Sequence, residues 1–316
     1  MALPRSIARV VRAVEQEEGD GAIVWRSIGT PKLRDLSPFL LLDHFASSTQ
    51  GSFPDHPHRG QETITYMIQG ESHHEDFTGG KGILRSGDLQ FMTAGRGIMH
   101  SEIPAPGHDG SPMTGLQIWV DLPTELKYCE PRYRDLRASE IPTVEVDEGK
   151  VQVKVISGES HGVESLKELA YTPVWLLDIK IKPGGRIVQK VPERYTAFAY
   201  TLSGTTCFEG NYGGATSSEE KISPRFGPYH NVIFEKTGDC IIAGVPSDTK
   251  ETGNFILAAG PPLDQEVVRY GPFVLNSQEE IRRVQMRANR LLHRLQRRPH
   301  TRDVAIPAHL DPDTRG

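Results

Sequence analysis

The chain has 316 residues and a formal net charge of −5, which argues against a protein coated with basic residues for nucleic-acid binding. Its 31 glycines and 23 prolines make up about 17% of the residues, where about 12% is usual, and this content favours many short strands over long helices. Hydrophobic residues make up 37%, enough for a packed core, but no aliphatic run approaches the ~20 residues of a membrane-spanning helix. The composition excludes a membrane span and favours one large domain or two ordinary ones.

The cysteines indicate a reducing environment. Cys129, Cys207 and Cys240 are too few and too scattered for a disulfide framework, and no two have the spacing of a thiolate metal site. Arginines interrupt the apolar residues of the first dozen positions, so the start of the chain lacks the apolar core of a signal peptide. We therefore expect an intracellular protein, in the cytoplasm, the nucleus or both.

Strand-like runs separated by turn residues recur through most of the chain, beginning with residues 9–14. Their spacing predicts an all-β barrel or sandwich, with short helices at residues 165–169 and near residues 138–141. The further strands expected are Thr63–Ile68, Gly115–Val120, Val151–Ile156, Trp175–Ile181, Ala197–Leu202 and Phe255–Ala258.

The two halves of the chain echo each other. Residues 66–70 match residues 200–204, each run starting at a tyrosine and ending at a glycine, and Gly87-Asp88 matches Gly238-Asp239. The second copy then carries an insertion at residues 211–221, whose Gly, Ser and Glu content is typical of a loop. The match favours two similar β-barrels in tandem, although so short a match leaves one large domain open.

The last part of the chain has a different character. Ser277 and Glu280 form a capping box at the start of a helix predicted over 277–298, and apolar residues follow at helical spacing from Ile281 to Leu295. Residues 281–298 of this helix carry seven arginines and no acid, so the rest of the chain holds a charge of about −12 against their +7. Residues 299–316 are polar, and we expect them to be disordered.

Two short motifs carry the chemistry. His56 and His58 stand two apart, so in an extended strand both imidazoles project from one face. His100 and Glu102 repeat that spacing after a glycine-rich turn. Three imidazoles and one carboxylate on paired strands suit a first-row metal such as Fe(II), Ni(II), Mn(II), Cu(II) or Zn(II). Glu62, four residues after His58, falls on the same face and is a second candidate carboxylate; exposed polar loops are the alternative interpretation of the whole set.

These motifs resemble the pirin family of the cupin superfamily, most of all its eukaryotic members. The resemblance covers about residues 5–285. It rests on residues 53–60, Glu62-Thr63, residues 87–90, residues 92–102, Gly115–Val120, Ile156–Glu159 and Gly271–Asn276.

The resemblance implies an all-β bicupin, with two tandem jelly-roll barrels and a C-terminal helix. Residues 1–135 would form the N-terminal barrel with the metal site, and residues 136–276 a C-terminal barrel without metal ligands. The basic helix 277–298 and the tail 299–316 would follow.

The resemblance also implies a ligand set of His56, His58, His100 and Glu102, with Fe(II) as the first choice of metal and Ni, Mn, Cu or Zn as alternatives. Glu62 would then orient a histidine instead of binding the metal.

The repeat supports this assignment of the metal to the first barrel. Aligning the two tyrosines that start the matching runs puts Lys190 opposite His56 and Pro192 opposite His58. Counting on from Gly238 puts Glu251 opposite His100, so the second copy lacks the ligand set.

The surroundings of the site are less well defined by the sequence. Arg59, Phe53 and Gln117 are candidates for the substrate pocket, and Gln61 stands where pirins usually have an aromatic residue. The cluster His73 to Asp76 is interpreted as a solvated turn. His230, alone in the second half, is expected to be a hydrogen-bonded structural residue.

By resemblance, the first functional hypothesis is an enzyme of the quercetin 2,3-dioxygenase type. Such an enzyme opens the heterocycle of a flavonol with O2 and releases carbon monoxide, and Glu102 would act as the catalytic residue that takes the substrate's hydroxyl proton. The site chemistry suits other phenolic or enolic substrates equally well, because it demands only an oxidisable ligand with two neighbouring oxygens.

The second hypothesis, also by resemblance, is a nuclear, iron-dependent co-regulator that binds a transcription factor. Nucleic-acid contact is expected only through residues 281–298, whose arginines suit an acidic surface. The favoured interpretation of this helix is nevertheless a solvated basic face whose apolar stripe packs on a barrel.

Overall fold

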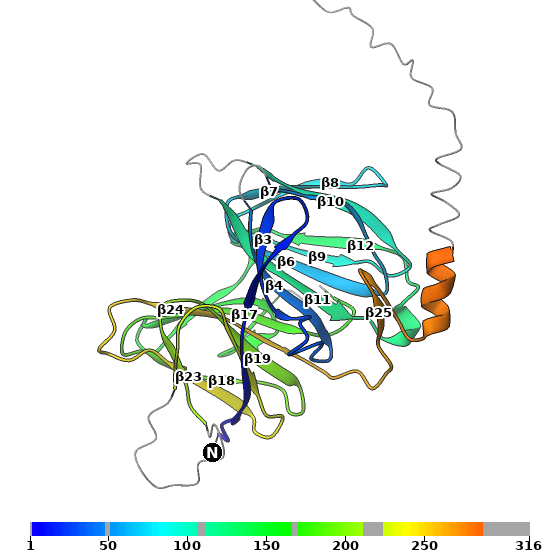
Figure 1. Ribbon diagram of the computed structural model, residues 1–316. Helices are drawn as coiled ribbons and strands as arrows, with labels where there is room; N and C mark the ends of the chain where they lie inside the picture. Colours follow the sequence, from blue (N-terminus) through cyan, green and yellow to red (C-terminus); the bar gives the residue numbers. More distant parts are fainter. Residues whose placement is uncertain (1, 48–50, 106–111, 166–169, 211–223, 287–316) are drawn as a thin grey trace, which may run out of the picture.

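The computed structural model describes residues 2–47, 51–105, 112–165, 170–210 and 224–286. It confirms the predicted all-β fold with two tandem barrels (Figure 1). Each barrel has a seven-stranded antiparallel sheet and a four-stranded sheet, and the strands follow the same order in both except at one edge of the seven-stranded sheets. Within the described part of the chain, no helix has the length and hydropathy needed to cross a bilayer.

The first barrel contains the strands predicted around the metal motifs. In spatial order, its seven-stranded sheet is β12 (Arg132–Leu136), β9 (Leu89–Thr93), β6 (Gln61–Gln69), β11 (Met113–Asp121), β4 (Phe39–Ser47), β3 (Ala22–Ile28) and β2 (Val14–Glu18). The four-stranded sheet is β5 (Phe53–His58), β10 (Ile98–Ala105), β7 (Glu71–Asp76) and β8 (Lys81–Arg85).

The second barrel repeats this plan. Its seven-stranded sheet is β1 (Ile7–Arg12), β22 (His230–Phe234), β19 (Thr196–Ser203), β24 (Gly253–Gly260), β17 (Trp175–Ile181), β14 (Val151–Ser157) and β13 (Thr143–Val146). The four-stranded sheet is β18 (Arg186–Lys190), β23 (Cys240–Gly244), β20 (Thr206–Phe208) and β21 (Arg225–Phe226).

The remaining elements are short. They are the 3-10 helices η1 (Thr124–Leu126) and η2 (Ala138–Glu140), the hairpin β15 (Glu159–Ser160) and β16 (Val163–Glu164), the hairpin β25 (Val268–Tyr270) and β26 (Phe273–Leu275), and a helix over 278–286. The short helix expected near 138–141 is present as η2. Residues 166–169 of the other short helix, the insertion at 211–221 and the tail at 299–316 lie outside the described residues.

The predicted match between the two halves is confirmed for the tyrosines, and it is wrong for the two Gly-Asp turns. Tyr66 on β6 and Tyr200 on β19 occupy the same place in the two sheets. However, the strand after Gly87 is β9, which pairs with β6, whereas the strand after Gly238 is β23, which pairs with β18. Glu251 therefore follows β23 and is no counterpart of His100. A two-residue turn precedes many strands, so its sequence does not define which strand follows.

The segments at the two ends of the described chain each pack on the other barrel than the predicted domain boundaries indicate. β1 was assigned to the first barrel, but it pairs with β22 and extends the sheet of the second (Figure 1). The hairpin β25–β26 was assigned to the second barrel, but the backbone N–H of Val274 donates to the carbonyl oxygen of Arg59 at 3.0 Å, beside the metal motifs. These pairings join residues far apart in sequence, which local patterns do not reveal.

The two seven-stranded sheets face each other and form one core between the barrels. Phe39 and Leu116 from the first barrel belong to the same buried cluster as Phe198 and Ile256 from the second. The rings of Phe39 and Phe198 meet edge-on at 5.0 Å. Burial of this apolar surface stabilises the barrels as a single unit.

The interiors of the two barrels differ. A cluster of 21 buried apolar residues, from Ile7 to Ala259, fills the second barrel. In the described part of the first barrel the interior clusters are smaller: Val24, Phe45, Met67, Leu84 and Met113 form one, and Met92, Ala94 and Ile98 form another. The first barrel is therefore the one with interior space for a ligand.

The C-terminal helix packs on the hairpin β25–β26. The Oγ of Ser277 accepts a hydrogen bond from the N–H of Glu280 at 3.2 Å, as the capping box predicts. Ile281 and Val284 pack against the hairpin. Of the seven arginines predicted on this helix, Arg282 and Arg283 are described, and both are exposed.

Candidate metal centre

Three histidines gather at the edge of the four-stranded sheet of the first barrel. In the antiparallel ladder of β5 and β10, His100 lies directly opposite His56, and His58 lies opposite Ile98. Alternation along β5 turns His56 and His58 to the same side, as the spacing predicted. One ring nitrogen from each of the three histidines lies within 4.8 Å of the others.

The rings of the three histidines present free nitrogens to one another. Nδ1 of His56 lies 2.8 Å from the carbonyl oxygen of Pro54, which can only accept, so this nitrogen carries the proton and Nε2 is left as a ligand. That Nε2 lies 3.1 Å from Nε2 of His100. Nε2 of His58 is buried and has no hydrogen-bond partner among the described residues.

Burial keeps the imidazoles of His58 and His100 neutral. It lowers the pKa of His100 to about 4, and burial together with the two neighbouring histidines lowers the pKa of His58 well below 6.5. Metal ions bind the neutral form of imidazole. The site therefore offers metal-binding nitrogens at neutral pH without first losing protons.

Gln61 contacts His58. Its side chain is fully buried, and its amide nitrogen lies 2.9 Å from Nδ1 of His58 and 3.4 Å from the carbonyl oxygen of Pro272. If His58 held a cation through Nε2, Nδ1 would carry the ring proton, and the amide oxygen of Gln61 would accept it once the amide is turned over. In the sequence, Gln61 stands out only as a departure from the family pattern. The signal for this contact was its place three residues after His58, across a tight turn.

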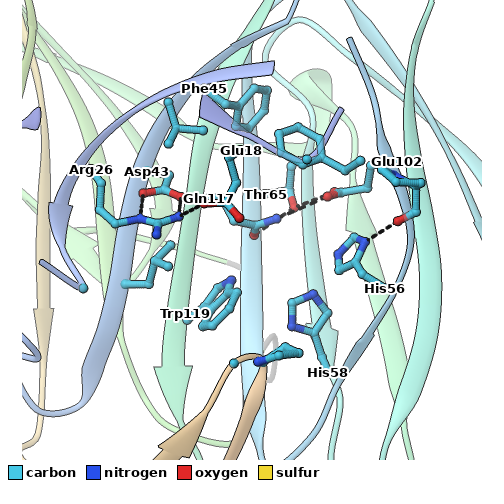
Figure 2. A pocket seen from close by; sticks show the side chains of 18 of the residues that line it. Glu18, Arg26, Asp43, Phe45, His56, His58, Thr65, Glu102, Gln117 and Trp119 are labelled. Atoms are coloured by element: carbon cyan, nitrogen blue, oxygen red, sulfur yellow. Dashed lines mark hydrogen bonds and ion pairs between the residues drawn. The ribbon is translucent and has the colours of Figure 1, made fainter. Parts of the chain in front are cut away.

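Glu102 lies near the three histidines, but its carboxylate is hydrogen-bonded to other side chains. Its carboxylate accepts long hydrogen bonds, both 3.4 Å, from the Oγ1 of Thr65 and the amide of Gln117 (Figure 2). It does not belong to the group of three whose ligand atoms gather within 4.8 Å. Its role as a fourth ligand stays a prediction, whereas its place on the pocket wall suits a proton acceptor.

The expectation that Glu62 orients a histidine is wrong. The carboxylate of Glu62 accepts hydrogen bonds from Thr93 at 2.7 Å and from the backbone N–H groups of Tyr171 and Thr172, both at 3.0 Å. The turn at Gly60, with φ of +72°, separates β5 from β6 and breaks the alternation on which the expectation depended. Glu62 therefore fastens a loop between the barrels.

A cavity of about 740 Å³ opens beside the histidines, within the range of small-molecule sites. Phe53 and Gln117 line it together with His56, His58 and Glu102. The pocket candidate Arg59 does not line it.

The guanidinium of Arg59 lies over the ring of Tyr128, 5.1 Å from its centre. Arg269 and Pro272 of the C-terminal hairpin complete the cavity wall, a contribution that no local motif indicated.

The cluster His73 to Asp76 is a strand and not a solvated turn. On β7 the side chains alternate, so His73 and Glu75 are exposed while His74 and Asp76 are buried. Nε2 of His74 lies 2.9 Å from the amide nitrogen of Gln90. The prediction of a solvated turn is wrong because it used only the polar composition of this segment. Composition does not distinguish a turn from a strand that alternates exposed and buried polar side chains.

His230 has the expected structural role. Its Nδ1 lies 3.0 Å from the carbonyl oxygen of Gly227.

The second barrel has no equivalent histidine group in its described part. Buried side chains on its β18 and β23, the strands that match β5 and β10, are Ile187, Gln189, Ile241, Ile242 and Ala243 among others. Lys190, which the tyrosine alignment set opposite His56, is exposed. Apolar packing replaces ligands at this position.

The residues of the first barrel fit a first-row transition metal. They supply three imidazoles, one of them with a buried nitrogen that has no hydrogen-bond partner in the described part of the chain, and a carboxylate on the adjoining wall. Imidazole with one carboxylate suits Fe(II), Ni(II), Mn(II), Cu(II) and Zn(II), while hard cations such as Ca²⁺ prefer all-oxygen sites.

Comparison with known proteins agrees with the two-barrel fold. The family model described as pirin matches residues 21–120, and the model of the pirin C-terminal cupin domain matches residues 176–287. A pirin-like protein of Solanum lycopersicum is 44% identical over 88% of this chain and 89% of its own length. Pirin of Homo sapiens is 43% identical over 89% of this chain and 91% of its own length.

Two solved structures show the same fold. Quercetin 2,3-dioxygenase from Acinetobacter baumannii superposes with a TM-score of 0.79 at 29% identity, covering 91% of this chain and 97% of that protein. A bacterial pirin from Escherichia coli, solved in complex with nickel(II), gives a TM-score of 0.60 at 18% identity, covering 81% of this chain and 99% of that protein.

Proposed function

The chain belongs to the pirin family, and we propose that it is a metal-dependent dioxygenase of the quercetin 2,3-dioxygenase type. The observation that carries the proposal is the cavity of the first barrel, which reaches His56 and His58 at one end and has Glu102 on its wall. The likeness to the Acinetobacter baumannii quercetin 2,3-dioxygenase supports it.

His56, His58 and His100 would hold the metal, with Glu102 as the predicted fourth ligand. Fe(II) is our first choice, and the nickel complex of the Escherichia coli pirin supports Ni(II) as an alternative. When bound, the ion would bring Lewis acidity and redox chemistry to two neighbouring oxygens of a substrate.

Protein side chains would then prepare the substrate. Glu102 lines the cavity and would accept the proton of a flavonol's 3-hydroxyl group, since a carboxylate within hydrogen-bond reach is a suitable base. Thr65 and Gln117 hold that carboxylate in place. Phe53 and Trp119 provide apolar wall against which the rings can pack and from which water is excluded.

The test combines metal analysis with oxygen uptake. Purified protein is assayed for bound metal, and O2 consumption is followed with a panel of flavonols and simpler enols. We expect metal-dependent uptake with flavonols and its loss in Glu102→Gln. Glu75→Gln, an exposed acid on β7, is the matched control and should keep full activity. Uptake with enols alone would assign a different substrate, and unchanged uptake in Glu102→Gln would contradict the role of that residue.

A second function, metal-dependent binding of a transcription factor, has one observation in its favour. The helix 278–286 packs on the hairpin β25–β26, and Pro272 of that hairpin contacts Gln61, the partner of His58. The helix that carries Arg282 and Arg283 is thus connected to the metal site through the hairpin and Gln61. If this function holds, exchange of Arg282 and Arg283 for glutamine in the full chain should abolish binding of an acidic partner. Binding is measured as a function of salt concentration, once with metal and once without.

A further inference from the structure

A charged cluster lines the cavity away from the histidines. Arg26 on β3 donates from Nε and Nη2 to the two carboxylate oxygens of Asp43 on β4, at 2.7 and 2.6 Å. Its Nη2 also donates to the carboxylate of Glu18, at the end of β2, at 2.8 Å. All three side chains line the cavity, and Figure 2 shows Arg26 and Asp43 on the opposite side from the histidines. We call Glu18, Arg26 and Asp43 the distal cluster.

The distal cluster is held rigidly. Asp43 and Arg26 expose only 7% and 17% of their side chains, while Glu18 exposes 43%. Burial opposes the charge on Arg26, but the hydrogen bonds and charge of Asp43 outweigh this and raise its pKa. The guanidinium is therefore a permanent cation, fixed by a two-pronged contact that sets its plane.

The cluster keeps hydrogen-bonding capacity to spare. Nη1 of Arg26 donates no hydrogen bond to any residue that the structure describes, and the same part of the chain sends none to Oε1 of Glu18. One donor and one acceptor thus remain available on two neighbouring residues that line the cavity. A hydroxyl group, which donates and accepts at once, suits this pair. A carboxylate ligand would meet two carboxylates here, so repulsion disfavours it.

The space between the cluster and the histidines suits flat rings. Leu41, Phe45, Phe53 and Trp119 line it. Nε1 of Trp119 is buried and has no hydrogen-bond partner within the described residues, so it is a further donor for a ligand oxygen. The cavity is therefore polar at both ends, and between them it combines apolar rings with the polar side chains of Thr65 and Gln117 (Figure 2).

We propose that the distal cluster is a hydroxyl-recognition subsite for polyphenols. It binds the ring hydroxyls at one end of the ligand while the hydroxyl–oxo pair at the other end reaches the histidines. The inference rests on the proposed function and extends it, because it selects elongated flavonols with neighbouring hydroxyls on the distal ring over simple enols. Glu18 accepts one hydroxyl proton in a hydrogen bond, and Arg26 donates to the hydroxyl oxygen.

The test separates this subsite from the metal chemistry. Binding of 3′,4′-dihydroxyflavone and of unsubstituted flavone, which both lack the 3-hydroxyl, is measured by calorimetry on the metal-loaded full chain without O2. We expect the dihydroxy compound to bind about tenfold more tightly, because each hydrogen bond to a charged group contributes appreciably. Glu18→Gln should remove most of that preference.

The matched control is Glu17→Gln, an exposed neighbour on β2 that does not line the cavity and should keep the full preference. Equal affinity of the wild-type chain for the two flavones, or an unchanged preference in Glu18→Gln, overturns the subsite. O2 uptake with 3-hydroxyflavone is measured in parallel. O2 uptake without a preference for the dihydroxyflavone would support the proposed function and rule out the subsite. A preference for the dihydroxyflavone without O2 uptake would support the subsite and rule out the proposed function.

Discussion

The amide nitrogen of Gln61 lies 2.9 Å from Nδ1 of His58, and both side chains are buried. This contact fixes the plane of the imidazole and directs its free Nε2 toward His56 and His100. Partners of this kind usually tune metal affinity as strongly as the ligands' own geometry does.

Gln61→Leu should therefore weaken metal binding by about 10- to 100-fold, because His58 loses the contact that orients its ring. Affinity is measured by competition with a chelator of known strength. Gln152→Leu, a half-buried glutamine on β14 of the second barrel, is the control and should bind metal like the wild type. An unaltered affinity in Gln61→Leu would show that packing alone orients His58.

Replacement of His58 by glutamine should leave the purified chain without bound metal, since the group of three loses a buried nitrogen that has no hydrogen-bond partner among the described residues. Metal content is measured by mass spectrometry, and folding by circular dichroism. His73→Gln removes an exposed imidazole from β7 and should keep the metal. Equal metal content in the two variants would mean that the ion binds elsewhere.

Lys127 and Asp121 form a buried ion pair, each exposing 1% of its side chain. Nζ of Lys127 also donates to the carbonyl oxygen of Gly60 at 2.9 Å, in the turn that follows His58. Lys127→Met should lower the free energy of unfolding by about 3–5 kcal/mol, because it leaves a buried carboxylate without its cation. Urea denaturation measures the loss.

The exposed pair of Arg186 and Glu209 provides the comparison for Lys127. Arg186→Met should cost less than about 1 kcal/mol, since water screens exposed pairs. Losses of similar size in the two variants would argue against burial as the cause.

His44 makes stability depend on pH. Burial lowers its pKa from 6.5 to about 4, so the unfolded chain takes up a proton before the folded chain does as the pH falls. The contribution of His44 to the free energy of unfolding is fully present above pH 6.5. It decreases as the pH falls toward 4, by roughly 3 kcal/mol in all. Denaturation of metal-free protein across this range should show a shallower pH dependence in His44→Leu than in the wild type. Parallel curves for the two proteins would contradict the assignment, and His73→Gln should follow the wild type.

The sequence carried enough information for the barrels and for the three histidines. Alternation along a strand is a local property, so the pairs His56 and His58, and His100 and Glu102, could be placed on shared faces without a structure. The prediction for Glu62 used the same rule across Gly60, where a turn resets the alternation, and it was wrong for that reason.

Contacts between distant segments were beyond local patterns. Nothing in the sequence around Arg26 or Asp43 indicates that these two residues line the cavity wall opposite the histidines, because each lies in an ordinary strand. Pro272 reaches Gln61 only through the docking of a hairpin from the far end of the chain. Such contacts depend on tertiary packing, which overrides the period of any single strand.

The pairing of β1 with β22 has a consequence for the order in which the molecule is completed. During synthesis the first strand emerges long before its partner, so it stays without a hydrogen-bonding neighbour until residues 230–234 leave the ribosome. The wall of the cavity is finished later still, when residues 268–275 arrive and close on the first barrel. A nascent chain therefore contains its three histidines early and acquires a complete ligand cavity only after the hairpin β25–β26 has been made.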